Sequence, residues 1–412
     1  MVPVLFITFI ICLFIGVPVA FSLGFSALAY FLGANMPIAT FSQRFFAGLD
    51  SFTLLCIPGF TLAGNLMNQG GISDKLMDFC DKLVGHLTGG MAYANIMASM
   101  IFAGISGTAL SDTVALGGIE IPMMVDLGYD ADFSVAVTAA SSCMGPIIPP
   151  SLPMIMAATM TGLSVSKMFM AGIVPGILMG GGMALVSYII SKKRNYPKRD
   201  HMSSFSEILI ILLGIIGGMV TPTEASIICI VYGTFVGFAI YRKLTLKTFY
   251  QCLQQTLSSA ASIMALVAFA NVFAYIMTKE HIPKMIADTM LSLTDNKYIL
   301  LLLINIFLIF VGMFMETIAA ILILFPVLLQ LATSVGVDSI QFGVMVVMNL
   351  VLGLCTPPVG VCLFAATNIA GNKLSDNVKA LLPFLLANFA VLGLVTYVPF
   401  ITTGIANLIL GA

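Results

Sequence analysis

The sequence predicts an all-α polytopic membrane protein whose two halves repeat one plan in opposite orientations. Of the 412 residues, 59% are hydrophobic and 8% are charged, whereas roughly a quarter of a soluble domain is charged. Two apolar segments 208 residues apart are each interrupted by a proline pair, in Gly-Pro-Ile-Ile-Pro-Pro at 145–150 and Gly-Leu-Cys-Thr-Pro-Pro at 353–358. Similar apolar segments surround both interruptions in the same order. These observations predict two inverted repeats, each with a broken transmembrane helix.

The proline pairs also point to function. Each pair removes two backbone donors and stops an α-helix. Lipid tolerates such an interruption only where the freed backbone is buried in protein or lines a cavity. Matching interruptions in two halves are typical of the binding site of a secondary transporter. The broken segments are therefore the first candidates for an ion or substrate site.

Composition excludes several other functions. The net charge of −1 argues against nucleic acid as a partner. The eight cysteines show no CxxC spacing, so we expect buried free thiols and no disulfide framework or metal site. Residues 2–15 are apolar but lack a basic leading region, which predicts a first membrane segment and no cleaved signal peptide.

The first half contains seven segments in order. We expect an apolar pair broken at Pro18, a polar linker near Arg44, a helix, an amphipathic helix lying along the interface, a hairpin split at Gly104–Thr108, the broken segment and one further span. Their ranges are 2–15 with 17–33, 52–69, 72–86, 91–126, 132–162 and 168–190.

The second half repeats this plan. It has an apolar pair that breaks at Pro222, a helix, an amphipathic stretch, a hairpin split near Gly312–Glu316, the broken segment and a last apolar region. Their ranges are 207–219 with 222–241, 257–277, 279–288, 299–334, 340–370 and 380–410. We expect Asn271 in the helix at 257–277, like Asn65 in its first-half equivalent, to cap a helix or join it to a neighbour.

This plan predicts a topology. Residues 1–190 form the first inverted repeat, 191–206 a cytoplasmic linker, and 207–412 the second repeat. If each repeat has five crossings plus one hairpin that enters and returns, the second is inverted. Placing 191–206 in the cytoplasm puts twelve of the 17 lysines and arginines inside and five outside, as the positive-inside rule requires. Both chain termini then lie outside, and the two hairpins enter from opposite faces.

The tip of the first hairpin contains the candidate residues Ser106, Gly107, Thr108 and Asp112. Glycine and small hydroxyl residues let the chain turn and expose the hard oxygen ligands that suit Na⁺. A helix opened behind the turn offers free N–H groups to an anion. Close helix packing through small residues is the structural alternative. Asp112 favours function because a carboxylate at membrane depth is costly, although it also fits a structural partner of a nearby donor.

The tip of the second hairpin contains Gly312, Glu316 and Thr317, with Glu316 expected to take the part of Asp112. Glu316 interrupts a run without other charges, so its position needs a reason. A proton carrier, a neighbour of Na⁺ and an acceptor that stabilises the tip are the three alternatives, and we favour the last.

The broken segments supply the remaining candidates. Ser141 and Asn349 occupy equivalent positions before the proline pairs. Thr356 is the best single side-chain candidate for contact with an ion or substrate. The alternative role for all three side chains is to hydrogen-bond the carbonyl groups that the prolines leave free. We expect two Na⁺ sites, built mainly from backbone carbonyls, where tips and breaks face each other. One is framed by Ser106, Thr108, Gly145 and Pro149, and the other by Gly312, Thr317, Gly353 and Thr356. Pro357, in the second break, is a further candidate for ion or substrate binding.

Five stretches together resemble the large membrane subunit of TRAP (tripartite ATP-independent periplasmic) transporters, the DctM-like family. The resemblance covers essentially the whole chain. Thr108 stands where the family often has serine, and Glu316 where it usually has aspartate, which puts a ligand role at the second tip in doubt. The stretches are SGTALSDTVALGGIEIPMMVDLGYD (106–130), GPIIPPS (145–151), TPTEAS (221–226), GMFMETIAAILILFPVLL (312–329) and GLCTPPVG (353–360).

The resemblance implies an elevator-type transporter, in which the two re-entrant hairpins and the broken helices form a mobile transport domain and the other helices form a scaffold. It implies Na⁺ as the coupling ion, with no other cofactor, and import of a small organic anion, usually a carboxylate, across the bacterial inner membrane. The implied partners are a small four-helix membrane subunit, expected as a separate polypeptide, and a periplasmic solute-binding protein.

Other classes fit less well. An intramembrane enzyme is disfavoured because His86, His201 and His281 lie in no HExxH motif and no GxSxG element occurs. A channel also accepts broken helices, but the hairpin tips would block a continuous pore. A self-sufficient ion-coupled carboxylate carrier is the nearest alternative.

Overall fold

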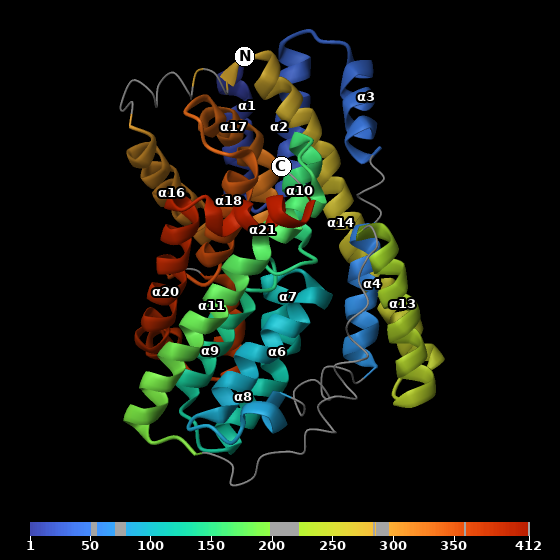
Figure 1. Cartoon of the computed structure of the whole chain (residues 1–412). Helices are drawn as coiled ribbons and strands as arrows, with labels where there is room; N and C mark the ends of the chain where they lie inside the picture. The colour runs from blue at the N-terminus through green and yellow to red at the C-terminus, as the bar shows by residue number, and fades with distance from the viewer. Residues whose placement is uncertain are drawn as a thin grey trace.

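The computed structural model describes residues 1–50, 56–70, 80–197, 222–282, 285, 296–357 and 360–410. Within these ranges every regular element is helical and none is a strand (Figure 1). Four of the described helices, α11, α14, α17 and α20, are long and apolar enough to cross a bilayer. The segment expected at 207–219, residues 72–79 of the amphipathic segment expected at 72–86, and half of the one expected at 279–288 lie outside the described residues.

The first half forms helices close to the expected ranges. The hairpin and the broken segment each divide where glycine or proline interrupts the pattern. The helices are α1 (Val2–Phe14), α2 (Val19–Gly33), α3 (Ile38–Leu49), α4 (Cys56–Gln69), α6 (Gly90–Ser106), α7 (Ala109–Ala115), α8 (Gly117–Asp126), α9 (Ala131–Ser142), α10 (Leu152–Thr161) and α11 (Val165–Arg194).

The second half follows the same order. Its first described helix continues into a π-helical turn at Val236–Ile240. The helices are α13 (Pro222–Phe235), α14 (Leu246–Lys279), α16 (Lys297–Phe314), α17 (Thr317–Ser334), α18 (Ser339–Gly353), α19 (Val361–Ala370), α20 (Leu374–Tyr397) and α21 (Phe400–Leu410).

The long helix α14 organises one group of helices. It packs against α2, α3 and α4, and α13 packs against α4. Figure 1 shows α3, α4, α13 and α14 toward the right-hand side of the molecule. The predicted polar linker near Arg44 is wrong, because this segment is helix α3. Its Phe45 ring lies 4.9 Å from that of Phe269, and the Arg44 guanidinium lies 4.3 Å over the ring of Tyr275. Aromatic packing on α14 therefore outweighs the polar composition of the segment.

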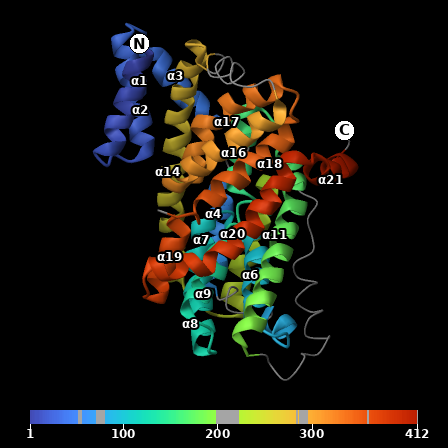
Figure 2. The same ribbon diagram turned by 90° about the vertical axis from the view of Figure 1, so that its left-hand side faces the viewer.

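The other helices form a second group around α9 and α18, which are almost entirely buried. In Figure 1, α9 lies low and α10 high, whereas in Figure 2, α18 lies high and α19 low. The pair α6 and α8 lies in the lower half of both views, and α16 and α17 lie in the upper half. The two halves thus run in opposite directions through this group.

The halves exchange contacts within this group. Helix α10, which follows the first break, packs against α17 of the second hairpin. Helix α19, which follows the second break, packs against α7 and α8 of the first hairpin. Each hairpin therefore lies against the broken helix of the opposite half.

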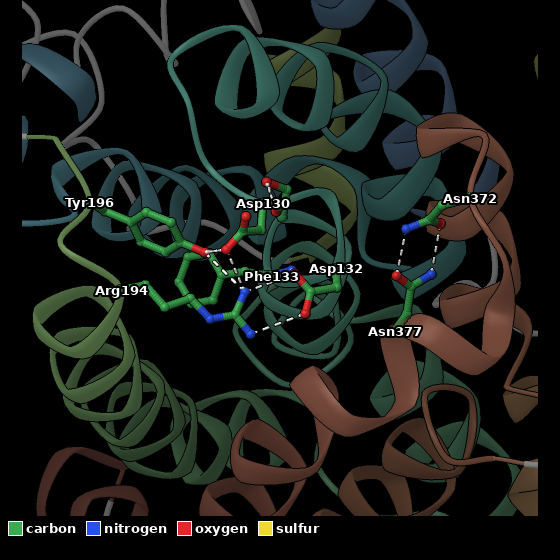
Figure 3. Close-up of polar contacts among 8 residues, drawn as sticks. Asp130, Asp132, Phe133, Arg194, Tyr196, Asn372 and Asn377 are labelled. Carbon is green, nitrogen blue, oxygen red and sulfur yellow. Dashed lines mark hydrogen bonds and ion pairs between the residues drawn. The ribbon is translucent and has the colours of Figure 1, made fainter.

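Polar contacts at one end join α11 to α9 (Figure 3). Arg194 donates to the carboxylates of Asp130 and Asp132 at 2.8 Å each, and the Tyr196 hydroxyl donates to Asp130 at 2.7 Å. Asn372 and Asn377, also drawn in Figure 3, exchange two hydrogen bonds that tie the start of α20 to the turn before it. The Tyr196 hydrogen bond, followed by Arg194, lowers the pKa of Asp130 below its usual value.

Two further boundaries differ from the expectation. Helix α14 begins at Leu246 rather than near 257, because Thr245 and Thr248 form a reciprocal capping box there. The last apolar region is two helices, since α20 ends at Tyr397 and α21 starts at Phe400, on either side of Pro399.

Candidate functional site: two hairpin tips, two breaks and a cavity

The first hairpin tip contacts the first break through Gly107. This residue has φ of +63°, and a Cβ atom there would lie 3.2 Å from the carbonyl oxygen of Pro150 and 3.3 Å from the backbone nitrogen of Leu152. Only glycine combines this backbone conformation with so close an approach. Ser106 ends α6 and Thr108 precedes α7, so both flank this contact.

Asp112 extends the same contact to the start of the break. The residue is fully buried on α7, and its Oδ2 lies so close to Gly145 that a Cβ atom at 145 would overlap it. A carboxylate thus lies against the backbone of the first break.

The second tip contacts the second break through backbone alone. A Cβ atom on Gly353 would lie 2.6 Å from the Cα of Gly312, and one on Gly312 would lie 2.7 Å from the carbonyl oxygen of Leu350. Helices α16 and α18 therefore cross at a glycine pair, and two predicted site residues meet there.

Glu316 acts at this tip as a helix cap. It is the N-cap residue of α17, and its Oε2 accepts a hydrogen bond from the backbone nitrogen of Ala319 at 3.0 Å. This is the tip-stabilising contact favoured from the sequence. The expected equivalence of Glu316 with Asp112 is wrong, however. Thr108, also an N-cap residue and 208 residues earlier, is the structural counterpart of Glu316.

Thr317 follows this cap and has an unusual hydroxyl. The residue is 2% exposed, and its Oγ1 has no hydrogen-bond partner. An unsatisfied buried hydroxyl costs about 1–3 kcal/mol. This cost is offset if a ligand supplies the missing contact.

A cavity of about 490 Å³ lies between the tips and the helices α4 and α14. Its lining includes three predicted residues, Thr108, Glu316 and Thr317, and contains no lysine, arginine or histidine among the described residues. Glu316 is its one acidic residue. The other polar side chains of the lining are Thr61, Asn65, Ser111, Ser259 and Ser262.

Ser141 and Asn349 lie away from this cavity, in two buried polar clusters. Ser141 accepts a hydrogen bond from Ser99 and donates one to the Oδ1 of Asn95, both at 2.9 Å. Asn349 donates to the Oδ1 of Asn305 at 2.6 Å. These contacts fasten α9 to α6 and α18 to α16, so each broken helix is held to the first helix of its own hairpin.

Thr356 is half-buried in the second break, and its hydroxyl donates to the carbonyl oxygen of Leu352 at 2.7 Å. This is the carbonyl-satisfying role left open from the sequence. The lone pairs of the hydroxyl oxygen stay available to a cation. Pro149 and Pro357 lie in the turns of the two breaks, each half-buried.

The two breaks meet at the centre of the molecule. The Sγ atoms of Cys143 and Cys355 lie 3.0 Å apart, and the Cys143 thiol also contacts the carbonyl oxygen of Val351 at 3.6 Å. The described cysteines are free thiols, as expected. The two predicted ion sites thus belong to adjoining parts of one buried region.

The cavity wall on α4 and α14 is the feature that sequence reasoning missed. Asn65 donates to Thr256 at 3.0 Å, which is the helix-joining role expected for it, yet it also lines the cavity. Ser259 and Ser262 come from α14. The run Ser258-Ser259-Ala260-Ala261-Ser262 inside an apolar helix was the available signal.

Comparisons with known proteins agree with this architecture. The family described as tripartite ATP-independent periplasmic transporter, DctM component, matches residues 6–401. The sialic acid TRAP transporter large permease protein SiaM of Vibrio cholerae is 40% identical over 97% of both chains. The isethionate TRAP transporter permease protein DctMQ of Oleidesulfovibrio alaskensis is 41% identical, over 96% of this chain and 65% of its own length.

Two further relatives extend the comparison. The 2,3-diketo-L-gulonate TRAP transporter large permease protein YiaN of Escherichia coli is 36% identical over 93% of this chain and 94% of its own length. The solved structure of the YdaH transporter of Alcanivorax borkumensis has a TM-score of 0.66 at 15% identity, covering 89% of this chain and 88% of that one; this likeness concerns the fold alone. The chain is therefore an integral membrane transport protein rather than an enzyme, and it belongs to the DctM family, the large permease component of TRAP transporters.

Proposed function

We propose that this chain imports a small organic anion, most often a carboxylate, in symport with Na⁺. The cavity between the hairpin tips and α4 and α14 supports this function. Its volume of about 490 Å³ falls within the range of small-molecule sites, about 300–1,000 Å³. The relatives named for sialic acid, isethionate and 2,3-diketo-L-gulonate all handle organic acids.

The charge of the cavity is the observation that supports Na⁺ coupling. The described lining contains Glu316 and no cationic side chain. An organic anion entering this cavity must leave its hydration shell, and burying a charge without a counter-charge is strongly unfavourable. Bound cations beside the cavity supply that counter-charge. Anion binding and Na⁺ binding then favour each other, which is the thermodynamic basis of symport.

The two tip–break contacts are the proposed cation sites. Gly107 against Pro150 and Gly312 against Gly353 bring the hairpin tips and the interrupted helices within a few ångströms of each other. Thr317 presents a hydroxyl without a partner at the second tip, and Thr356 keeps its oxygen lone pairs. Carbonyl and hydroxyl oxygens are the ligands that hard cations prefer.

The two groups of helices suggest how access alternates. We assign α1–α4, α13 and α14 to a fixed scaffold, and the two re-entrant hairpins with the broken helices to a moving transport domain. The cavity lies between the two groups, with Asn65 and Ser262 on the scaffold side and Thr108 and Thr317 on the other. Sliding of one group past the other would carry the site across the bilayer, as in an elevator.

We further propose that the chain works in the bacterial inner membrane with a small four-helix membrane subunit and a periplasmic solute-binding protein. The binding protein would deliver the anion to the outward-facing cavity. The family to which the chain belongs is named for a tripartite system.

Reconstitution in liposomes tests this function. The purified chain is combined with the small subunit and a loaded binding protein, under an inward Na⁺ gradient. Sialic acid, a C4-dicarboxylate, isethionate and diketogulonate are offered in turn. We expect Na⁺-driven uptake of one class, and only with all three components. Robust uptake by the chain alone would favour a self-sufficient carrier, and single-turnover ionic currents would favour a channel.

The proposed orientation has its own test. Asn195, the residue that ends α11, should face the cytoplasm. We expect Asn195→Cys in a cysteine-free background to resist an impermeant thiol reagent in intact cells and to react in inverted vesicles. Reaction in intact cells would reverse the orientation.

A further inference from the structure

A second acid at membrane depth, Glu120, lies outside the cavity and outside the proposed Na⁺ sites. It occupies the first turn of α8 and is 0% exposed. Among the described residues, neither Oε1 nor Oε2 has a hydrogen-bond partner. Buried carboxylates are normally paired or hydrogen-bonded, so this side chain needs an explanation.

The neighbouring helices offer Glu120 no cation. Helix α8 packs against α6, α7, α9 and α19, and none of these five helices contains lysine, arginine or histidine. Among the described residues, Asp112 acts electrostatically on Glu120, and Glu120 acts on Cys80. The described titratable groups on and beside these elements are Tyr93, Asp112, Asp126, Tyr129, Asp130, Asp132, Cys143 and Cys362, with Cys80, Asp81, Lys82 and His86 from residues 80–86.

The packing around α8 is apolar. A Cβ atom on Gly117, one turn before Glu120, would meet the methyl group of Thr138 and the side chains of Ile121 and Ile369. A hard cation requires several oxygen ligands, and the atoms that this packing places against Gly117 are methyl and aliphatic carbons. A proton needs no such ligand set.

We propose that Glu120 is a proton-binding site within the first hairpin. In the packed state the side chain is a neutral carboxylic acid, because an ionised one would be a buried, unpaired charge. Release of the proton to water leaves a carboxylate that needs solvent or a counter-ion. Ionisation therefore favours states in which α8 separates from α9 and α19, and the conformational equilibrium of this hairpin depends on pH. The proposal does not depend on which anion or coupling ion is transported.

Infrared difference spectroscopy tests the protonation directly. The purified protein in detergent is compared with Glu120→Gln at neutral pH. We expect the wild type to show the C=O stretch of a protonated carboxylic acid that Glu120→Gln lacks. Asp126→Asn, at an exposed acid of the same helix, should keep this band. An identical carboxylic acid band in the wild type and in Glu120→Gln would overturn the proposal.

The pH dependence of unfolding gives a second readout. An ordinary glutamate is ionised above about pH 4.3, so the folded protein holds one proton more than the unfolded chain at neutral pH. Stability then falls as pH rises, by up to about tenfold in the unfolding equilibrium constant per pH unit. We expect Glu120→Gln to lose this slope between about pH 6 and pH 9, and Asp126→Asn to retain it.

Glu120→Met provides the same test if Glu120→Gln does not fold, because methionine is unbranched, neutral and of similar length. A neutral, unpaired Glu120 predicts that the Met variant folds and also lacks the slope. Equal slopes in the wild type and both variants would contradict the proposal. Stability that depends on Na⁺ rather than on pH, and only when Glu120 is present, would identify a cation ligand instead and overturn it.

Discussion

The two tip–break contacts share one layout but are built from different atoms. In the first half, the Gly107 backbone lies against Pro150 and the Asp112 side chain lies against Gly145, whereas in the second, the backbone of Gly312 lies against that of Gly353. A side chain can rotate away from an added atom, but a helix backbone can retreat only by moving the whole helix. The second contact is therefore the more rigid, and the first the more adjustable.

The caps of the two halves differ in the same way. Asp338 caps α18 by accepting hydrogen bonds from Ile340 and Gln341 at 2.9 Å. Asp130, its counterpart before α9, caps nothing with its side chain and instead binds Arg194 and Tyr196. The aspartate at this repeat position therefore caps its own helix in the second half and binds residues at the end of another helix in the first.

The largest effect is expected for Gly353→Ala. The new methyl carbon would lie 2.6 Å from the Cα of Gly312, and overpacking of this kind costs about 1–3 kcal/mol. We expect lower thermal stability in detergent and loss of uptake. Gly145→Ala, which displaces the Asp112 carboxylate, should be milder in both assays.

Gly393→Ala is the matched control, because nothing lies within 4 Å of a Cβ atom at that helical position. It should leave stability unchanged or raise it by up to about 1 kcal/mol. Equal losses for Gly353→Ala and Gly145→Ala would remove the distinction between the two contacts.

The next effect is expected for Thr317→Val, which keeps the shape of the side chain and removes the unpartnered hydroxyl. Relief of an unsatisfied polar group should raise stability by about 1 kcal/mol, while the Na⁺ concentration for half-maximal uptake rises. Thr356→Ala should raise the same Na⁺ concentration without the gain in stability, because its hydroxyl already bonds Leu352. Unchanged Na⁺ dependence in either variant would remove that residue from the ion site.

Glu316 allows cap and charge to be separated. Glu316→Ala removes the acceptor for the Ala319 nitrogen and should cost about 1 kcal/mol of stability. Glu316→Gln keeps an acceptor oxygen, so the fold should hold while Na⁺ affinity falls with the lost charge. Glu316→Asp, with a stronger capping residue, should retain both. Normal Na⁺ dependence in Glu316→Gln would mean that this acid only caps.

The smallest effect is expected for Asp130→Asn, which should change how the stability of the protein depends on pH. The pKa of Asp130 is lowered in the folded protein, so its contribution is present above the unfolded value of about 3.9 and is lost as pH falls through the folded value. Because the pair is partly exposed, Asp130→Asn should cost only about 0.2–1 kcal/mol near neutral pH. The deficit should vanish in acid, as thermal unfolding from about pH 7 to pH 3 would show. Asp338→Asn should be neutral throughout, because Asn caps as well as Asp.

Sequence patterns predicted the interrupted helices well. Proline pairs and glycine turns act locally on the backbone, so the ends of α9, α10 and α18 lie close to where 145–150 and 353–358 placed them. Helix α3 was missed because the polar residues around Arg44 were given more weight than Ile38, Phe41 and Phe45, which recur at helical spacing. The partner of its aromatic face, α14, is far away in the chain, so the contact itself could not be predicted from this segment.

The candidate site was predictable only in part. Gly312 and Gly353 lie in contact, and both had been identified because they interrupt the apolar helical pattern at the second tip and the second break. The pairing of Glu316 with Asp112 failed because like charge was given more weight than the turn, and the turn places Thr108 opposite Glu316. The wall formed by Asn65 and Ser262 depends on how the two helix groups dock. Glu120 lies within the 106–130 motif, and nothing in the sequence distinguished it from its neighbours before its burial was known.

The crossed packing of α10 on α17, and of α19 on α7 and α8, has a consequence for folding. Each half supplies part of the surface on which the helix after the other half's break is buried. A lone half would leave that surface facing lipid, so neither half is expected to fold as an independent unit, even though each contains its own tip and its own break.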